Sequence, residues 1–148
     1  SIELSGSLNI EGDFTNNFSG QLIFNSIRDC SLFYTEIFYS DIIKTGTGSL
    51  NFLSDVSTIK NIILISGGLN TKGFSVDCSD FIASGNIQRE LNVEDSKFSV
   101  DKWLIIPGTN LKFSEDKSSV FFKNGISAGT MKATSDFWLL AASFLRSL

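Results

Sequence analysis

Apolar residues recur along this chain as very short triplets in which every second residue is apolar, and this pattern constrains the fold more than any other feature. A period of two residues is typical of a β-strand with one buried face and one exposed face. Gly, Asn, Ser and Asp separate one triplet from the next. The sequence therefore predicts many short strands, at residues 8–10, 22–24, 37–39, 50–52, 63–65, 74–76, 91–93, 98–100, 103–105, 111–113 and 120–122.

The triplets also return at loosely regular intervals. The segment GSLNI at 6–10 returns as GSLNF after 42 residues, and Leu-Asn followed by an apolar residue returns at Leu91 after a further 41. The segment FSVD at 74–77 returns after 24 residues, which predicts that Asp77 and Asp101 occupy equivalent positions. Since half of 41 or 42 lies close to 24, the repeat unit is 20 to 24 residues long. This is the size of one turn of a β-solenoid, whereas helical repeats of that length would need longer runs at a spacing of 3.6.

We therefore predict an all-β chain that forms a right-handed parallel β-helix of about seven short turns over residues 1–133. The right hand follows from the preference for right-handed crossovers between parallel strands. The rival is an antiparallel sandwich of the immunoglobulin or jelly-roll type. Such folds tend to use two-residue hairpins such as Asn-Gly. The chain offers one good candidate, Asn124-Gly125, so the solenoid is favoured.

Residues 134–148 form a second predicted unit, a C-terminal helix. Ser135 or Asp136 can serve as its N-cap, and the apolar residues that follow form a stripe along one side. Because a solenoid end exposes unpaired strand edges and core side chains, we expect Phe137 and Trp138 to help this helix cap the final turn. Two alternatives stay open. The helix docks on a partner or a membrane surface, or the chain end is not native to the repeat.

Composition excludes several classes of function. The chain has no histidine, which excludes Ser-His-Asp and Cys-His catalytic sets and histidine-ligated metals. A net charge of −4 argues against nucleic-acid binding. No apolar stretch is long enough to span a membrane, so membrane insertion is not expected. The chain opens directly into strand-like sequence, so an export signal would have been removed or would lie further upstream.

The remaining chemistry is sparse. Cys30 and Cys78 show no metal-ligand spacing, and we expect two small buried side chains, with a single disulfide as the alternative in an exported protein. Adjacent carboxylates such as Glu94 and Asp95 point to opposite faces of a strand, so they do not form an acid/base dyad. No calcium-loop motif is present in the sequence. The prediction is a protein that is not an enzyme and carries no metal or cofactor.

Tyr34 and Tyr39 are the candidate ligand-binding residues. They lie in the stretch 32–39, which is apolar or aromatic on both alternating faces. A strand of this kind is either covered by another element or offers an adhesive patch. Covering by a loop or by the C-terminal helix is the main expectation. The alternative is a sugar- or protein-binding face to which the two tyrosines supply rings and hydroxyl groups.

The middle of the chain carries a series of motifs, namely SDV at 54–56, SGGLNT at 66–71, GF at 73–74, RELNV at 89–93, Trp103, LKF at 111–113 and SVFF at 119–122. This series resembles the β-helical repeat regions of large secreted surface proteins of Bacteroidota, often described as adhesin-like or gliding-motility-associated. The opening segment 6–14 is similar to the preceding turn of the same repeat. The resemblance departs after Asn124-Gly125, where the family would continue with another strand turn instead of a helix.

The resemblance implies a secreted or cell-surface protein delivered by the type IX secretion machinery. It also implies structural roles for Arg89, through pairing with Glu90, Glu94 or Asp95, and for Trp103. We therefore expect a non-enzymatic structural or adhesive module whose ligand is a surface glycan or a protein. The alternative is a carbohydrate-binding or carbohydrate-active β-helix, similar to polysaccharide lyases or hydrolases. An enzyme of that kind would gather carboxylates, Arg and Lys along one sheet face.

Overall fold

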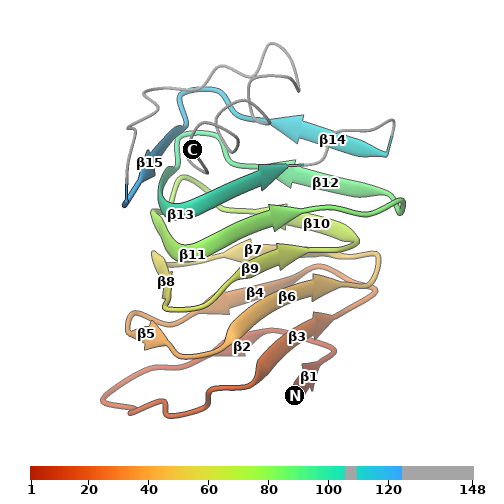
Figure 1. Cartoon of the computed structure of the whole chain (residues 1–148). Helices are drawn as coiled ribbons and strands as arrows, with labels where there is room; N and C mark the ends of the chain where they lie inside the picture. The colour runs from red at the N-terminus through yellow and green to blue at the C-terminus, as the bar shows by residue number, and fades with distance from the viewer. Residues whose placement is uncertain (106–109, 125–148) are drawn as a thin grey trace.

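The strands of this chain stack in parallel along one axis, so that each turn of the chain lies on the turn before it (Figure 1). The computed structural model describes residues 1–105 and 110–124. Every strand pair within these residues is parallel, which confirms the β-solenoid and excludes the antiparallel sandwich. The strands are β1 (Ile2–Leu4), β2 (Leu8–Asn9), β3 (Gln21–Asn25), β4 (Cys30–Phe33), β5 (Ile37–Phe38), β6 (Asp41–Thr45), β7 (Ser49–Phe52), β8 (Val56–Thr58), β9 (Ile62–Leu64), β10 (Gly67–Asn70), β11 (Val76–Ala83), β12 (Arg89–Asn92), β13 (Lys97–Ile105), β14 (Leu111–Ser114) and β15 (Ser119–Phe122).

The solenoid has three faces, because the long strands β11 and β13 bend from one face into the next. Face 1 consists of β1, β3, β6, β9 and the C-terminal halves of β11 and β13. Face 2 consists of β5, β8, the N-terminal halves of β11 and β13, and β15. The six-stranded sheet of β2, β4, β7, β10, β12 and β14 is face 3. These six strands mark about six turns, against the seven expected over residues 1–133. The predicted C-terminal helix, 134–148, lies outside the described residues.

The register confirms one of the predicted repeats and corrects two. Leu50 pairs with Leu69 and Leu69 with Leu91, so the match between Leu50 and Leu91 is structural. The match of 6–10 to 48–52 is wrong by two residues, because Leu8 pairs with Leu32 and Leu32 with Phe52. The match of FSVD is wrong by the same amount.

In that second case Asp77 pairs with Ser99 and not with Asp101. The carboxylate of Asp101 instead accepts hydrogen bonds from Ser79 Oγ at 3.3 Å and from Asn124 Nδ2 at 2.6 Å. Asp77 forms an ion pair with Lys123 at 2.8 Å. The two aspartates therefore do not form a stacked pair, and each has its own partners.

The interior of the solenoid is filled by rows of side chains that stack from turn to turn. Cys30 and Cys78 belong to these rows and are buried and free, which confirms the expected pair of small buried side chains. Lys44 also points inward, between Phe24 of the turn below and Leu64 of the turn above. The two inward rows of face 1 are Leu22, Ile42, Ile62, Phe81 and Trp103, and Phe24, Lys44, Leu64, Ala83 and Ile105.

The corner between face 3 and face 2 repeats the same backbone conformation in three successive turns. Lys72, Asp95 and Lys117 each have a φ between 54° and 59°, the left-handed conformation that non-glycine residues rarely adopt. In each turn an amide just after this residue closes a tight hydrogen-bonded turn, as in Ser118 N to Glu115 O at 2.9 Å. Buried hydroxyl groups complete the corner, with the Thr71 and Ser96 oxygens 2.6 Å apart.

The outer surfaces of the three faces differ in chemistry. Face 1 presents an aliphatic row, Ile23, Ile43, Ile63, Ile82 and Leu104, in register across five strands. Face 3 presents the half-buried asparagines Asn51, Asn70 and Asn92, which point outward as expected. Face 2 presents mainly serine and charged side chains, and it is the face next to the candidate site.

Candidate functional site

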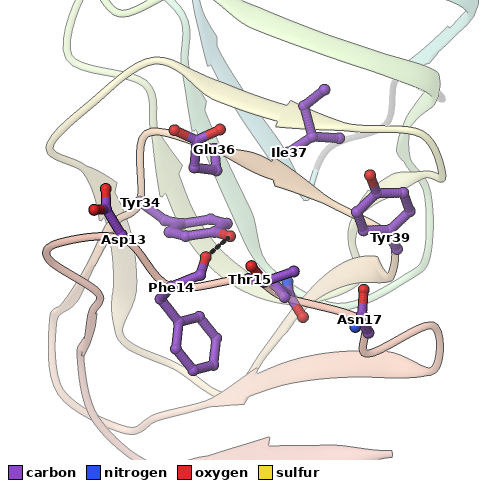
Figure 2. Close-up of a pocket in the computed structure, with 9 residues that line it drawn as sticks. Asp13, Phe14, Thr15, Asn17, Tyr34, Glu36, Ile37 and Tyr39 are labelled. Carbon is purple, nitrogen blue, oxygen red and sulfur yellow. Dashed lines mark hydrogen bonds between the residues drawn. The ribbon is translucent and has the colours of Figure 1, made fainter.

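A pocket of about 330 Å³ lies at the N-terminal end of the solenoid, where the loop between β2 and β3 passes β5. We call it the tyrosine pocket (Figure 2). It brings together the two predicted ligand-binding residues, Tyr34 and Tyr39, one turn after the loop that faces them. The residues that line it are Asp13, Phe14, Thr15, Asn16, Asn17, Tyr34, Glu36, Ile37 and Tyr39.

Local hydrogen bonds shape the loop that forms one wall of the pocket. Gly12 has a φ of 82°, a conformation that favours glycine, and its carbonyl accepts a hydrogen bond from Phe14 N at 2.9 Å. The side-chain oxygen of Asn16 accepts a hydrogen bond from Phe18 N at 2.9 Å, which is a typical asparagine turn. The loop therefore has a defined path without belonging to a strand.

Tyr34 is the buried tyrosine of the pair, with only 2% of its surface exposed. Its hydroxyl group donates to the Phe14 carbonyl at 3.2 Å, and its ring contacts that of Phe38 with centroids 4.7 Å apart. Its backbone is held from the next turn, where Ser54 Oγ lies 3.2 Å from Tyr34 N and 3.1 Å from Tyr34 O. Tyr34 is therefore covered by a loop, as the main expectation had it, and it forms a fixed wall.

Tyr39 differs from Tyr34 because 43% of its surface is exposed. Its ring lies across the pocket from Tyr34 (Figure 2). Ile37, at 45% exposure, and Phe14 add further accessible apolar surface. The adhesive patch that the aromatic stretch suggested is thus present, but Tyr39 and Ile37 carry it, not Tyr34. Ligand binding by the two tyrosines stays a prediction.

Polar groups surround this apolar surface. Asp13 and Glu36 supply carboxylates, and Asn16 and Asn17 supply amide groups. Burial, and secondarily the negative charge of Glu36, raises the pKa of Tyr34. The phenol therefore stays protonated over the ordinary pH range and keeps donating to Phe14. The pocket can contact an apolar face of a ligand and exchange hydrogen bonds with its polar edge.

Sequence reasoning missed the loop residues of this pocket. Asp13, Asn16 and Asn17 lie in a segment without apolar periodicity, and no motif marked them. The available signal was a run of small polar residues after Gly12, at a length that places it one repeat before the aromatic stretch. Glu36 was missed because it interrupts that stretch between β4 and β5.

The residues predicted to be structural lie elsewhere. Trp103 is fully buried on face 1, stacked on Phe81 with centroids 4.8 Å apart and an interplanar angle of 13°. Arg89 is buried at the start of β12, and its Nε donates to Ile87 O at 3.3 Å. Glu90, one of its expected partners, forms an ion pair with Lys112 at 2.8 Å. Phe137 and Trp138 lie outside the described residues.

Two searches of the described ranges, 1–105 and 110–124, return nothing. They contain no group of three or more His, Cys, Asp or Glu side chains placed to hold a metal ion. They also contain no helix long and apolar enough to cross a membrane.

No protein-family model, no curated protein and no solved structure matches this chain. The functional argument therefore depends on the fold and on the geometry of the pocket.

Proposed function

We propose that this chain is a non-enzymatic structural and adhesive module of a bacterial secreted or cell-surface protein, and that the tyrosine pocket is its ligand site. The observation that carries the adhesive part is the half-exposed Tyr39 ring, held in a pocket next to carboxylates and amides. The structural part is supported by the stacked parallel turns, because each turn contacts only its neighbours and forms an extended, regular body.

A surface glycan is the ligand that this pocket fits best. Sugar rings present apolar C–H faces that pack on aromatic rings, while their hydroxyl groups donate to carboxylates and exchange hydrogen bonds with amides. Tyr39 and Ile37 would contact the ring face, and Asp13, Glu36 and Asn17 would contact the hydroxyl groups. A protein ligand with an exposed aromatic or aliphatic side chain is the alternative partner.

Binding of the purified chain to immobilised glycans tests the proposal. Tyr39→Ala should abolish binding, and Tyr39→Phe should retain most of it because the ring is kept. Ile87→Ala is the matched control, since Ile87 is also exposed but lies away from the pocket. Glycan binding that is equal for the parent chain and Tyr39→Ala would contradict the proposal.

A carbohydrate-active enzyme is the second candidate, and one observation favours it. Asp13 and Glu36 line the same pocket, and paired carboxylates are the groups that glycoside hydrolysis uses. Under this alternative the chain would release reducing sugars from a polysaccharide, and Asp13→Asn or Glu36→Gln would stop the release. Bound but intact glycan would instead support the adhesive function.

Export by the type IX machinery and a cell-surface or secreted location belong to the same proposal, on the resemblance to Bacteroidota surface proteins. So do the right hand of the solenoid and the capping role of 134–148. In the capping role, Phe137 and Trp138 would cover the last described turn, where Val120 and Phe122 are buried. Deletion of 134–148 should then expose apolar core and strand edges, and cause aggregation or end-to-end stacking. A monomeric deletion variant with an unchanged Tm would contradict the cap.

A further inference from the structure

Face 2 carries a second concave feature, a groove of about 410 Å³ that runs over β8, β11, β13 and β15. We call it the serine trough, because Ser57, Ser75, Ser99 and Ser119 form much of its lining. Larger side chains, among them Asp77, Lys97 and Phe121, also line it. The trough therefore combines a small, hydroxyl-rich floor with taller polar and apolar walls.

The strand register arranges these residues in rows along the solenoid axis. Ile37 pairs with Ser57, Asp77 with Ser57 and Ser99, and Ser99 with Phe121. At about 4.8 Å between neighbouring strands, the row from Ile37 to Phe121 is ~19 Å long. Apolar side chains stand at its two ends, since Ile37 and Phe121 are 45% and 52% exposed. The row has the length of a short linear polymer.

The trough also continues from the tyrosine pocket. Ile37 lines that pocket and is the first residue of the row. Thr35 lines the trough, while its sequence neighbours Tyr34 and Glu36 line the pocket. A ligand with one end in the tyrosine pocket can therefore extend along face 2 without crossing a ridge between faces.

The charges of the trough indicate a neutral ligand. Asp77 forms an ion pair with Lys123 at 2.8 Å, and the Asp55 carboxylate accepts a hydrogen bond from Ser75 N at 2.8 Å. Lys97 adds a positive charge on the same face. Both signs are present, so neither a polyanion nor a polycation is favoured. Within the described ranges, the side-chain hydroxyls of Ser57, Ser99 and Ser119 form no hydrogen bond with the protein, so they can bond to the hydroxyl groups of a ligand.

We propose that a linear, neutral oligosaccharide binds along the serine trough, parallel to the solenoid axis, between the tyrosine pocket and Phe121. This inference rests on the proposed glycan-binding function of the tyrosine pocket. An extended peptide fits less well, because peptides that bind sheets pair with a free strand edge, whereas the strands of face 2 already pair with one another. Sugar hydroxyl groups need only the side chains that the trough presents.

Calorimetric titration with cello-, xylo- and manno-oligosaccharides, from the disaccharide to the hexasaccharide, tests the proposal. For the series that binds, the hexasaccharide should bind about tenfold or more tightly than the disaccharide. Ser99→Trp should fill the trough and remove this gain while leaving the disaccharide affinity unchanged. Ser114→Trp, at a similarly half-buried outer position on face 3, is the control and should change neither affinity. Phe121→Ala removes only exposed atoms and should weaken hexasaccharide binding alone.

The outcomes separate the two proposals. If Tyr39→Ala abolishes disaccharide binding but length brings no gain, the trough is overturned and the pocket stands. If Ser99→Trp weakens hexasaccharide binding while Tyr39→Ala does not, the trough stands and the pocket falls. Absence of binding to any member of the three series overturns both. Tighter binding of polygalacturonate than of a neutral chain of equal length overturns the neutral class of ligand.

Discussion

The hydroxyl group of Tyr34 donates a hydrogen bond to the backbone carbonyl of Phe14, 3.2 Å away and 20 residues earlier in the chain. This bond joins the loop of one turn to the strand segment of the next. Since Tyr34 is itself fixed by the ring of Phe38 and by Ser54, the loop wall of the tyrosine pocket is attached to the solenoid core. The shape of the candidate site therefore depends on a residue that a ligand would hardly touch.

Tyr34→Phe tests this attachment. The variant keeps the ring and removes the hydroxyl group, so we expect the free energy of unfolding to fall by about 0.5–1.5 kcal/mol. Hydrogen exchange at residues 13–17 should accelerate, because the loop loses its contact with the next turn. Tyr39→Phe is the control, because the hydroxyl group of Tyr39 belongs to a half-exposed side chain. Equal exchange in the loop of Tyr34→Phe and the parent chain would show that the bond does not hold the loop.

Trp103 should contribute to stability through its ring system. It stacks on Phe81 and meets Phe98 edge-on, with centroids 4.8 Å apart in both cases. Trp103→Ala should lower the free energy of unfolding by about 3–5 kcal/mol, because it leaves a large cavity. Trp103→Phe should lose clearly less in urea denaturation, since a smaller ring still fills the site and contacts Phe81. If the two variants are equally unstable, ring packing is not the role of Trp103.

Gly67 is fixed by its conformation and by its surroundings. Its φ is 72°, and a Cβ atom at this position would collide with the backbone carbonyl oxygens of Gly46 and Gly48 in the turn below. Gly67→Ala should therefore destabilise the protein by more than the ~1–2 kcal/mol of the left-handed conformation alone. Gly6→Ala is the matched control, because nothing lies within 4 Å of a Cβ atom there. Similar Tm values for the two variants would contradict this reading of the corner.

The sequence predicted the parallel solenoid because apolar triplets and a repeat of 20 to 24 residues leave few other folds. It located the register less well. Both wrong matches, 6–10 with 48–52 and 74–77 with 98–101, miss by two residues. A shift of two keeps every side chain on the same side of a strand, so the apolar pattern does not distinguish the two registers. The difference arises at corners of unequal length, where the chain shows no periodicity.

The candidate site was predicted in part for a related reason. Tyr34 and Tyr39 stood out because aromatic residues are conspicuous, but their difference in exposure depends on the loop at 13–17. The break between β4 and β5 lets both residues line one pocket, although an uninterrupted strand would point residues five apart to opposite faces. Neither the path of the loop nor this break follows from local pattern, because both are set by packing against the neighbouring turn.

Lys44 gives the last prediction, on the pH dependence of stability. Its side chain is 1% exposed inside the solenoid, where Nζ donates to the carbonyl oxygens of Thr45 and Gly46. Burial disfavours the charged form and lowers the pKa of Lys44 below the ordinary lysine value of 10.5, although Cys30 and Asp29 oppose the shift. Between the lowered pKa and 10.5, the unfolded chain therefore binds more protons at this residue than the folded chain does.

In that window the free energy of unfolding should rise with pH for the parent chain relative to Lys44→Met. Below the lowered pKa both states are protonated, so the difference between the two proteins should be constant and least favourable to the parent chain. Urea denaturation at a series of pH values up to 10.5 measures this difference. Lys60→Met makes the same change of charge at an exposed position, and comparison with it isolates the effect of burial. A difference that stays flat or falls with rising pH would show that Lys44 keeps its charge in the folded protein at no cost.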